Sequence, residues 1–299
     1  MPSASQTTRA QLQIHFCVLL WGFTAILGKL ISLPALALVV WRMLLVTAVL
    51  ALVPRVWRGL SRLPRRTLWI YAGIGTIVAL HWLTFYGSIK LANASVAATC
   101  IALAPVFLAV VEPLVTGKRF EPRELALGIA VVPGVALVVG GVPDGMRLGV
   151  AVGALSAFLV AIFGALNKRY IEHSDPLTVT ALELGAGALF LLAVGLAVPA
   201  LGDPLPLPSP KDAGLLVLLA LACTLLPFAL SLVALRQLSA YSAQLAINLE
   251  PVYAILLAIP LLGEQRELSP QFYLGVAIVL LAVIVHPWLR RDPAPAGAG

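Results

Sequence analysis

The sequence alternates long apolar runs with short breaks of proline, glycine and charged residues along almost its whole length. An α-helix crosses the hydrocarbon core of a bilayer, about 30 Å thick, with about 20 apolar residues. Runs of that length cover residues 12–31, 34–54, 67–89, 93–116 and 123–142, and then 147–167, 176–200, 212–235, 240–262 and 269–289. This pattern predicts ten transmembrane helices joined by short loops.

Two segments outside these runs have a distinct character. The stretch from Gly202 to Asp212 is rich in proline and is expected to be an extended connector. Residues 292–299 contain no side chain able to anchor them to a core and are predicted to form a disordered tail.

An internal repeat relates the two halves of the chain. With a shift of 146 residues, residues 94–121 align with 240–267, and eight positions are identical, Pro105 with Pro251 and Gly117 with Gly263 among them. Five spans per half is an odd number, so the halves must insert with opposite orientations. The sequence therefore predicts an all-α membrane protein, with inverted five-helix repeats at residues 1–145 and 146–291 around a central cavity.

Composition and charge agree with this architecture. The chain is 61% hydrophobic and 11% charged, whereas soluble proteins carry about 25% charged residues. A net charge of +7 would indicate nucleic acid in a soluble protein, but here the basic residues lie between the apolar runs, and no nucleic-acid partner is expected. With the N-terminus in the cytoplasm, 14 of the 20 Lys and Arg residues fall on that side and 5 on the other. The positive-inside rule then predicts cytoplasmic termini in a bacterial inner membrane.

Charged residues inside the spans are the first candidates for function, because each costs several kcal/mol unless it is paired or hydrated. Four qualify, namely Arg42, Glu112, Glu183 and Glu250. Glu250 precedes Pro251, whose repeat partner is Pro105, and paired helix interruptions of this kind indicate a midplane site. We expect both prolines to bend their helices. Alternatively, Glu250 caps strained backbone or pairs with Arg42 without touching solute; for Glu112 and Glu183 a structural role is favoured.

Polar and aromatic side chains also recur at helical spacing within the spans. Such stripes indicate either cavity lining or hydrogen bonds between packed helices, worth about 0.6 kcal/mol each. Lipid-facing surfaces would not carry Gln, Asn or His, so these faces are expected to turn inward. The predicted substrate-binding residues are Trp21, His81, Trp82, Tyr86, Asn167, Tyr241, Gln244, Asn248, Glu250 and Tyr253.

Sequence signals for catalysis are weak. The four histidines are dispersed, no glycine-rich phosphate loop is present, and the three cysteines lie in separate spans. We therefore expect neither a cofactor nor a metal site, and a membrane-embedded enzyme is only a remote alternative.

Several segments in order along the chain resemble the drug/metabolite transporter superfamily, specifically its EamA-type ten-helix exporters. They are Leu20-Trp-Gly-Phe, Leu80-His-Trp-Leu-Thr-Phe-Tyr, Ala104-Pro-Val, Leu249-Glu-Pro-Val and Leu262-Gly-Glu. The resemblance implies two inverted repeats around a cavity, outer helices at 123–142 and 269–289, and no prosthetic group.

One position departs from this resemblance. Gly263-Glu264 follows the pattern, but its first-half equivalent is Gly117-Lys118. A role that requires both acids is therefore in doubt, and the position of these residues at helix ends suggests a structural role.

These observations predict a secondary transporter that exports small metabolites by alternating access. Amino acids are the leading expectation, with aromatic ones a candidate subclass, because the inferred cavity is aromatic and polar with little net charge. A proton-coupled multidrug exporter, with Glu250 as its titrating group, is the alternative. The expected partners are a small-molecule substrate and the lipid bilayer, with the protein a monomer or weak homodimer.

Overall fold

The order of helices along the chain follows the apolar runs. The computed structural model describes residues 4–171, 175–238, 243, 246–247 and 249–289, and within them it contains helices and no strand. The first half comprises α1 (Ala4–Leu30), α2 (Ala35–Ala51), α3 (Pro54–Arg62), α4 (Arg65–Leu91), α5 (Ala94–Ile101), α6 (Ala104–Thr116) and α7 (Pro122–Gly141). The second half comprises α8 (Arg147–Tyr170), α9 (Pro176–Ala197), α10 (Pro210–Ala220), the π-helical turn η4 (Leu221–Leu225), α11 (Leu226–Leu235), α13 (Glu250–Leu262) and α14 (Pro270–Leu289). Short 3₁₀ turns lie at Asp144–Met146 (η1), Pro199–Leu201 (η3) and Glu264–Arg266 (η5).

The helices account for the predicted membrane spans. Every predicted apolar run overlaps one helix or a consecutive set of helices. Within the run 240–262, the described residues Ala243, Ala246 and Ile247 are helical, as is α13. By length and apolar composition, six helical segments of the described chain can cross a bilayer, or seven if α2 and α3, bent by 92°, count as one span. The helix α13 and residues 270–281 form shorter apolar helices.

Two connections differ from the sequence prediction. Residues 54–62, expected as a loop, form the helix α3. This helix begins at Pro54 and carries three arginines. Asp212, expected in an extended connector, lies in the first turn of α10 and is buried. Its carboxylate accepts hydrogen bonds from the backbone N–H and hydroxyl of Ser32 at 2.9 and 2.6 Å, which joins the start of α10 to the end of α1. The predicted tail at 292–299 lies outside the described residues.

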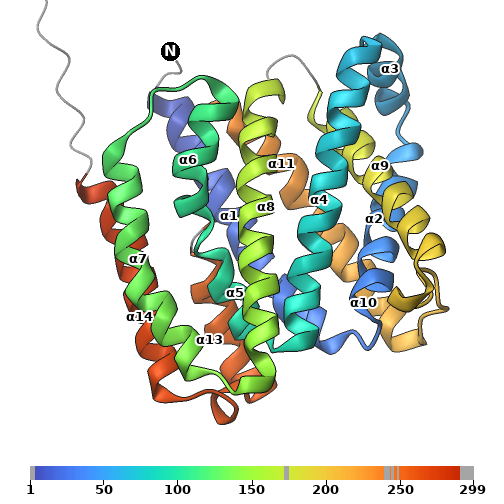
Figure 1. The fold of residues 1–299 in the computed structure, drawn as a ribbon. Helices are drawn as coiled ribbons and strands as arrows, with labels where there is room; N and C mark the ends of the chain where they lie inside the picture. Colours follow the sequence, from blue (N-terminus) through green and yellow to red (C-terminus); the bar gives the residue numbers. More distant parts are fainter. Residues whose placement is uncertain (1–3, 172–174, 239–242, 244–245, 248, 290–299) are drawn as a thin grey trace, which may run out of the picture.

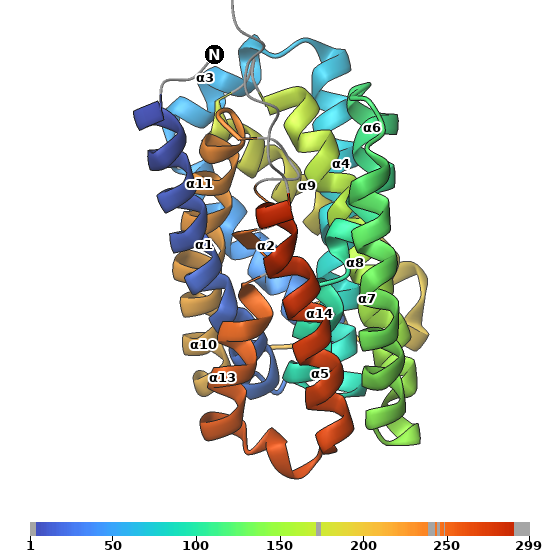
Figure 2. The ribbon, with the colours of Figure 1, turned by 90° about the vertical axis from the view of Figure 1, so that its left-hand side faces the viewer.

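The helices pack with an approximate twofold relation between the halves. α4 packs on α8 as α11 packs on α1, and α6 packs on α8 as α13 packs on α1. α2 packs on α9, and α7 on α14, so these helices meet their own counterparts (Figures 1 and 2). This exchange of equivalent contacts is what an inverted repeat requires.

The closest match between the halves lies at the interrupted spans. α6 and α13 are both 13 residues long, and the 146-residue shift relates both their first residues (104 and 250) and their last (116 and 262). Each ends at a left-handed glycine, Gly117 with φ of 74° and Gly263 with φ of 70°. A left-handed residue at this position closes a helix with little cost only when it is glycine.

The two prolines do not bend continuous helices. Pro105 and Pro251 both lie in the first turn of a new helix, where the missing N–H costs nothing. In the first half, Ala102 and Leu103 interrupt the helix between α5 and α6. The predicted interruption is therefore present there, but it takes the form of a break just before the proline.

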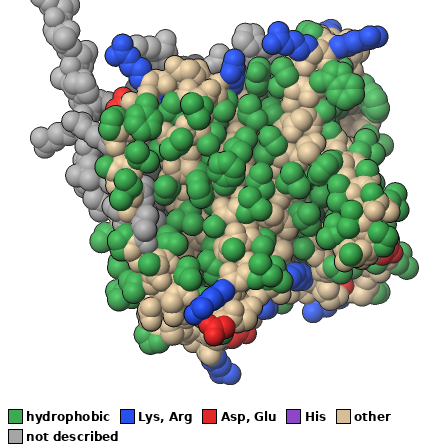
Figure 3. Space-filling model, in the orientation of Figure 1, with side chains coloured by type: hydrophobic (Ala, Val, Ile, Leu, Met, Phe, Trp, Pro, Cys, Tyr) green, Lys and Arg blue, Asp and Glu red, His purple; other side chains and the backbone are tan. Residues whose placement is uncertain are grey.

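The surface is divided in the way that a bilayer requires. On the face shown in Figure 3, apolar side chains cover the middle, and Lys and Arg gather near the two ends of the helices. The chain's N-terminus and the arginine-rich helix α3 lie at the same end (Figure 1). α7 and α14 pack together at one side of the bundle, where the resemblance placed the outer helices.

Candidate functional site

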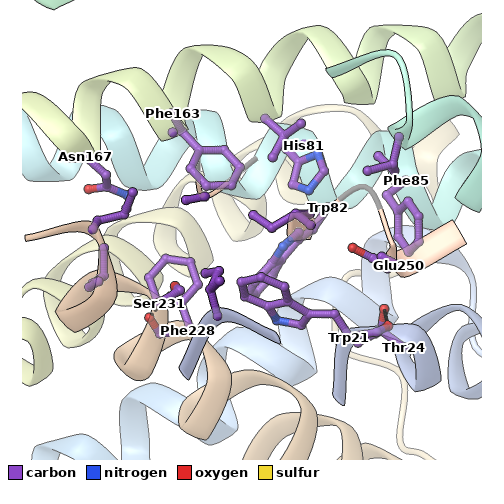
Figure 4. A pocket seen from close by; sticks show the side chains of 18 of the residues that line it. Trp21, Thr24, His81, Trp82, Phe85, Phe163, Asn167, Phe228, Ser231 and Glu250 are labelled. Carbon is purple, nitrogen blue, oxygen red and sulfur yellow. Dashed lines mark hydrogen bonds between the residues drawn. The ribbon is translucent and has the colours of Figure 1, made fainter. Parts of the chain in front are cut away.

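A cavity of about 100 Å³ lies between the two halves. It is lined from α1, α2, α4, α5 and α6 of the first half and from α8, α11 and α13 of the second. Figure 4 shows Asn167, Phe163 and Ser231 toward one end of the cavity and Trp21, Thr24 and Glu250 toward the other. Because both halves contribute, a relative movement of the halves would change the shape of this space.

Arg42 is the cationic side chain of the cavity and is 3% exposed. Its guanidinium carbon lies 3.7 Å from the centroid of the Trp82 ring, a cation–π contact worth about 2 kcal/mol when desolvated. Its Nη1 donates to the Tyr86 hydroxyl at 2.8 Å, and its Nε donates to Thr224 Oγ1 at 2.5 Å. Its Nη2 lies 3.5 Å from the Cys223 carbonyl. These contacts fix the plane of the guanidinium.

The turn that supplies two of these acceptors is unusual. Cys223 and Thr224 lie in the π-helical turn η4, between α10 and α11. A π-turn displaces a backbone carbonyl from regular helical bonding, and such turns are frequent at functional sites. Here the turn presents a carbonyl and a hydroxyl to Arg42.

An aromatic cluster forms one wall around His81. The His81 ring lies 5.3 Å from Phe163 and 6.3 Å from Phe85, measured between centroids. Its Nδ1 lies 3.0 Å from the carbonyl and 2.8 Å from the hydroxyl of Ser156. With the proton on Nδ1 and bonded to the carbonyl, Nε2 is left as an acceptor for a molecule in the cavity.

The two carboxyl groups near the cavity have different surroundings. Glu250, 8% exposed, lines the cavity from the first turn of α13, where the positive end of the helix dipole favours a negative charge. Glu183 is fully buried behind the wall, and its Oε2 accepts a 3.3 Å hydrogen bond from Asn167. Within the described chain, Glu183 Oε1 and Asn167 Oδ1 have no hydrogen-bond partner.

The comparisons with known proteins agree with this architecture. The model of the EamA-like transporter family matches the chain twice, at residues 9–140 and 147–286. The chain belongs to the EamA-like transporter family. Among solved structures, 26 chains match. One of them, named "Crystal structure of protein", has a TM-score of 0.68 and 18% identity over 95% of this chain and 99% of its own. At that identity the likeness shows the fold alone. No curated protein gives a significant match.

The structure places the predicted site residues of this EamA-like transporter in three groups. Those that line the cavity are Trp21, His81, Trp82, Asn167 and Glu250. Tyr86 and Tyr253 differ from the prediction, since neither lines it. Tyr86 is fully buried, and its hydroxyl accepts a hydrogen bond from Arg42. Tyr253 is 37% exposed on α13. Tyr241, Gln244 and Asn248 lie outside the described residues, although Ala243 and Ile247 from the same segment line the cavity.

Sequence reasoning missed several lining residues of the EamA-like transporter. The sequence marks Arg42 as a charge inside a span but does not place it in the cavity, which it lines in the structure. Phe163 lies on the same helix face as Asn167, four residues away, and the helical spacing indicates that this face turns inward, but Phe163 is not among the predicted substrate-binding residues. Phe228 and Ser231 lie within an apolar run with little polar patterning, and only the fold brings them to the site.

Glu264, which follows the family pattern, has a structural role in this transporter. Its carboxylate accepts hydrogen bonds from the backbone N–H groups of Ala94 and Ser95 at 2.9 and 2.8 Å and from the Ser95 hydroxyl at 2.6 Å. It therefore caps the N-terminus of α5 from across the repeat boundary. The first-half equivalent, Lys118, instead forms an ion pair with Glu112 at 3.7 Å.

The described part of the transporter contains no group of three or more His, Cys, Asp or Glu residues that could hold a metal ion.

Proposed function

We propose that this protein is a secondary carrier that exports amino acids, with aromatic ones as a candidate subclass, by alternating access. The observation that carries the proposal is the composition of the cavity. It combines aromatic rings, a guanidinium and a carboxyl group in one cavity. Rings provide a stacking surface, and the polar groups can orient a small molecule that has both apolar and charged parts.

The size of the cavity supports a small substrate. A cavity needs at least about 10–15 Å³ to hold one water molecule, so 100 Å³ leaves room for a small molecule. An amino acid matches this scale, whereas a large drug would require the halves to move apart first.

The proposed location is the inner membrane of a bacterium, with both termini in the cytoplasm. The support is the clustering of Arg55, Arg58 and Arg62 on α3, at the same end of the bundle as the N-terminus. Basic residues are enriched on the cytoplasmic side of bacterial membrane proteins. Cavity residues at the cytoplasmic end would then meet the substrate first during export.

A transport screen of the purified full-length protein in proteoliposomes tests the proposal. Radiolabelled amino acids are loaded inside, and their exchange against external unlabelled amino acid is followed with and without a proton gradient. We expect counterflow of at least one amino acid, saturable and absent from empty liposomes. If no amino acid exchanges under either condition, the proposal is wrong.

Proton-coupled export of drugs is a second candidate, favoured by the buried Glu250 carboxyl group in the cavity wall. A carboxyl at this place can bind a proton and a cationic drug in turn. In this case Glu250→Gln should abolish the acceleration of drug export by a proton gradient while leaving passive exchange measurable. Gradient-driven export that is unchanged in Glu250→Gln would reject this candidate.

A further inference from the structure

A buried cation in a membrane protein needs compensation, and Arg42 lacks the usual partner. In the described chain, no carboxylate forms an ion pair with its guanidinium, and the three hydrogen-bond acceptors that it has are neutral. Glu250 lines the same cavity, and its charge acts on the guanidinium, but the two groups form no ion pair in direct contact. The alternative in which Glu250 and Arg42 neutralise each other in direct contact is therefore not the arrangement seen here.

The guanidinium retains free hydrogen-bonding capacity. Arginine has five N–H donors, and three are used by Tyr86, Thr224 and Cys223. One N–H remains on each terminal nitrogen. A carboxylate can accept from both terminal nitrogens at once, with a charge-assisted bond to each oxygen.

The surroundings of Arg42 hold it in a fixed position for binding. Trp82 covers one face of the guanidinium, and Tyr86 and Thr224 hold its edge. Because these contacts already fix the side chain, a ligand would lose little affinity to ordering it. The aromatic rings of His81 and Phe163, in the same cavity, provide a place for an apolar group of that ligand.

We propose that Arg42 binds the carboxylate of the transported molecule, so that the cavity selects aromatic or apolar carboxylates, and that Glu250 receives the ammonium group where the substrate has one. The assignment rests on the proposed transport function, of which it names the recognition chemistry. It explains why a costly cation is placed at the cavity wall and why no carboxylate of the described chain is in direct contact with it.

Three matched compounds test this assignment on the purified full-length protein. L-phenylalanine has both charged groups, 3-phenylpropionate lacks the ammonium, and phenethylamine lacks the carboxylate. Binding is measured through quenching of tryptophan fluorescence, since Trp21 and Trp82 both line the cavity. We expect phenylalanine to bind most tightly, and phenethylamine, which lacks the carboxylate, to bind about tenfold to hundredfold more weakly than phenylalanine, the range expected for charge-assisted hydrogen bonds.

Variants locate the effect on Arg42. Arg42→Gln should weaken both carboxylate compounds about tenfold to hundredfold and leave phenethylamine unchanged or improved. Tyr86→Phe keeps the charge and removes one hydrogen bond that holds the guanidinium, so a smaller loss confined to the carboxylate compounds is expected even if Arg42→Gln does not fold. Arg147→Gln, which removes an exposed arginine paired with Asp144, is the control and should match the wild type.

The outcomes separate this inference from the proposed function. Binding of phenethylamine as tight as that of phenylalanine by the wild-type protein would overturn the role of Arg42, and so would the absence of binding by both carboxylates. Carboxylate-selective binding without any counterflow of amino acids would support the role of Arg42 and overturn only amino-acid transport.

Discussion

Removal of the Glu264 carboxylate should destabilise the protein through the N-terminus of α5. In the native structure Glu264 is 1% exposed, and Ala94 and Ser95, whose N–H groups it accepts, are fully buried. Glu264→Ala leaves both N–H groups without an acceptor in a place where water cannot easily replace it. Asn93 still caps the N–H of Val96 at 3.0 Å, so the helix start is weakened but not lost.

The expected loss follows from these contacts. Hydrogen bonds to a charged group contribute about 1.5–3 kcal/mol each, and a buried unpaired donor costs about 1–3 kcal/mol. Since the three bonds share one carboxylate and do not add fully, we expect a loss of about 3–5 kcal/mol in the free energy of unfolding. At about 2 °C per kcal/mol for a chain of this size, the melting temperature should fall by about 6–10 °C. Glu264→Gln keeps one acceptor oxygen and should lose roughly half as much.

Thermal unfolding of the detergent-purified variants, followed by intrinsic fluorescence, measures this shift. Glu267→Ala is the matched control, because Glu267 lies three residues away, is exposed and accepts a single 3.1 Å hydrogen bond from Asn93. Exposed groups of this kind contribute about 0–1 kcal/mol. If Glu264→Ala melts within about 2 °C of Glu267→Ala, a shift of about 1 kcal/mol, the carboxylate does not stabilise α5 as argued.

Three further changes have expected outcomes. A Cβ on Gly75 would lie 2.1 Å from the backbone carbonyl oxygen of Glu183. Gly75→Val should therefore prevent α4 from packing on α9 and abolish the folded fraction in size-exclusion chromatography. Gly73→Val is the control and should retain the folded fraction, because a Cβ there meets nothing within 4 Å. Glu183→Gln should melt no lower than the wild type in a fluorescence scan, since an amide of the same shape keeps an acceptor and adds a donor. A fall of more than about 4 °C, which corresponds to about 2 kcal/mol, would contradict this. Lys118→Glu should lower the melting temperature, because it replaces the ion pair with Glu112 by two like charges; an unchanged or higher value would show that this pair is not stabilising.

The sequence predicted those parts of the fold that depend on local pattern. Runs of apolar residues gave the helices, and the shared Gly, Pro and Leu positions gave the register in which α6 corresponds to α13. The nine-residue helix α3 was missed because it is too short and polar to stand out as a span, and it forms as an amphipathic segment at the end of the bundle. The burial of Asp212 was missed because its partner, Ser32, is 180 residues away.

The candidate site was predictable only in part for the same reason. Trp21, His81 and Trp82 lie on recognisable helical stripes, and the structure brings them to one cavity. Nothing in the spacing of Arg42 and Thr224, 182 residues apart, indicates that they touch. The π-turn that presents Thr224 also has no sequence signature of its own. Side-chain pairing between distant helices therefore had to come from the structure.

The two halves share a backbone arrangement but differ in the side chains at equivalent positions. This difference restricts how a substrate can be held. Glu250 and Ala104 are the equivalent first residues of α13 and α6, and Glu264 and Lys118 follow their equivalent ends. The carboxyl group in the cavity therefore comes from the second half alone. An inverted repeat lets the cavity open to either side, but a charged substrate cannot exploit that symmetry by binding in two related orientations. In the proposed alternating-access cycle, it should keep one orientation relative to Glu250 in both the inward-open and outward-open states, so that the helices move around a substrate that does not turn over.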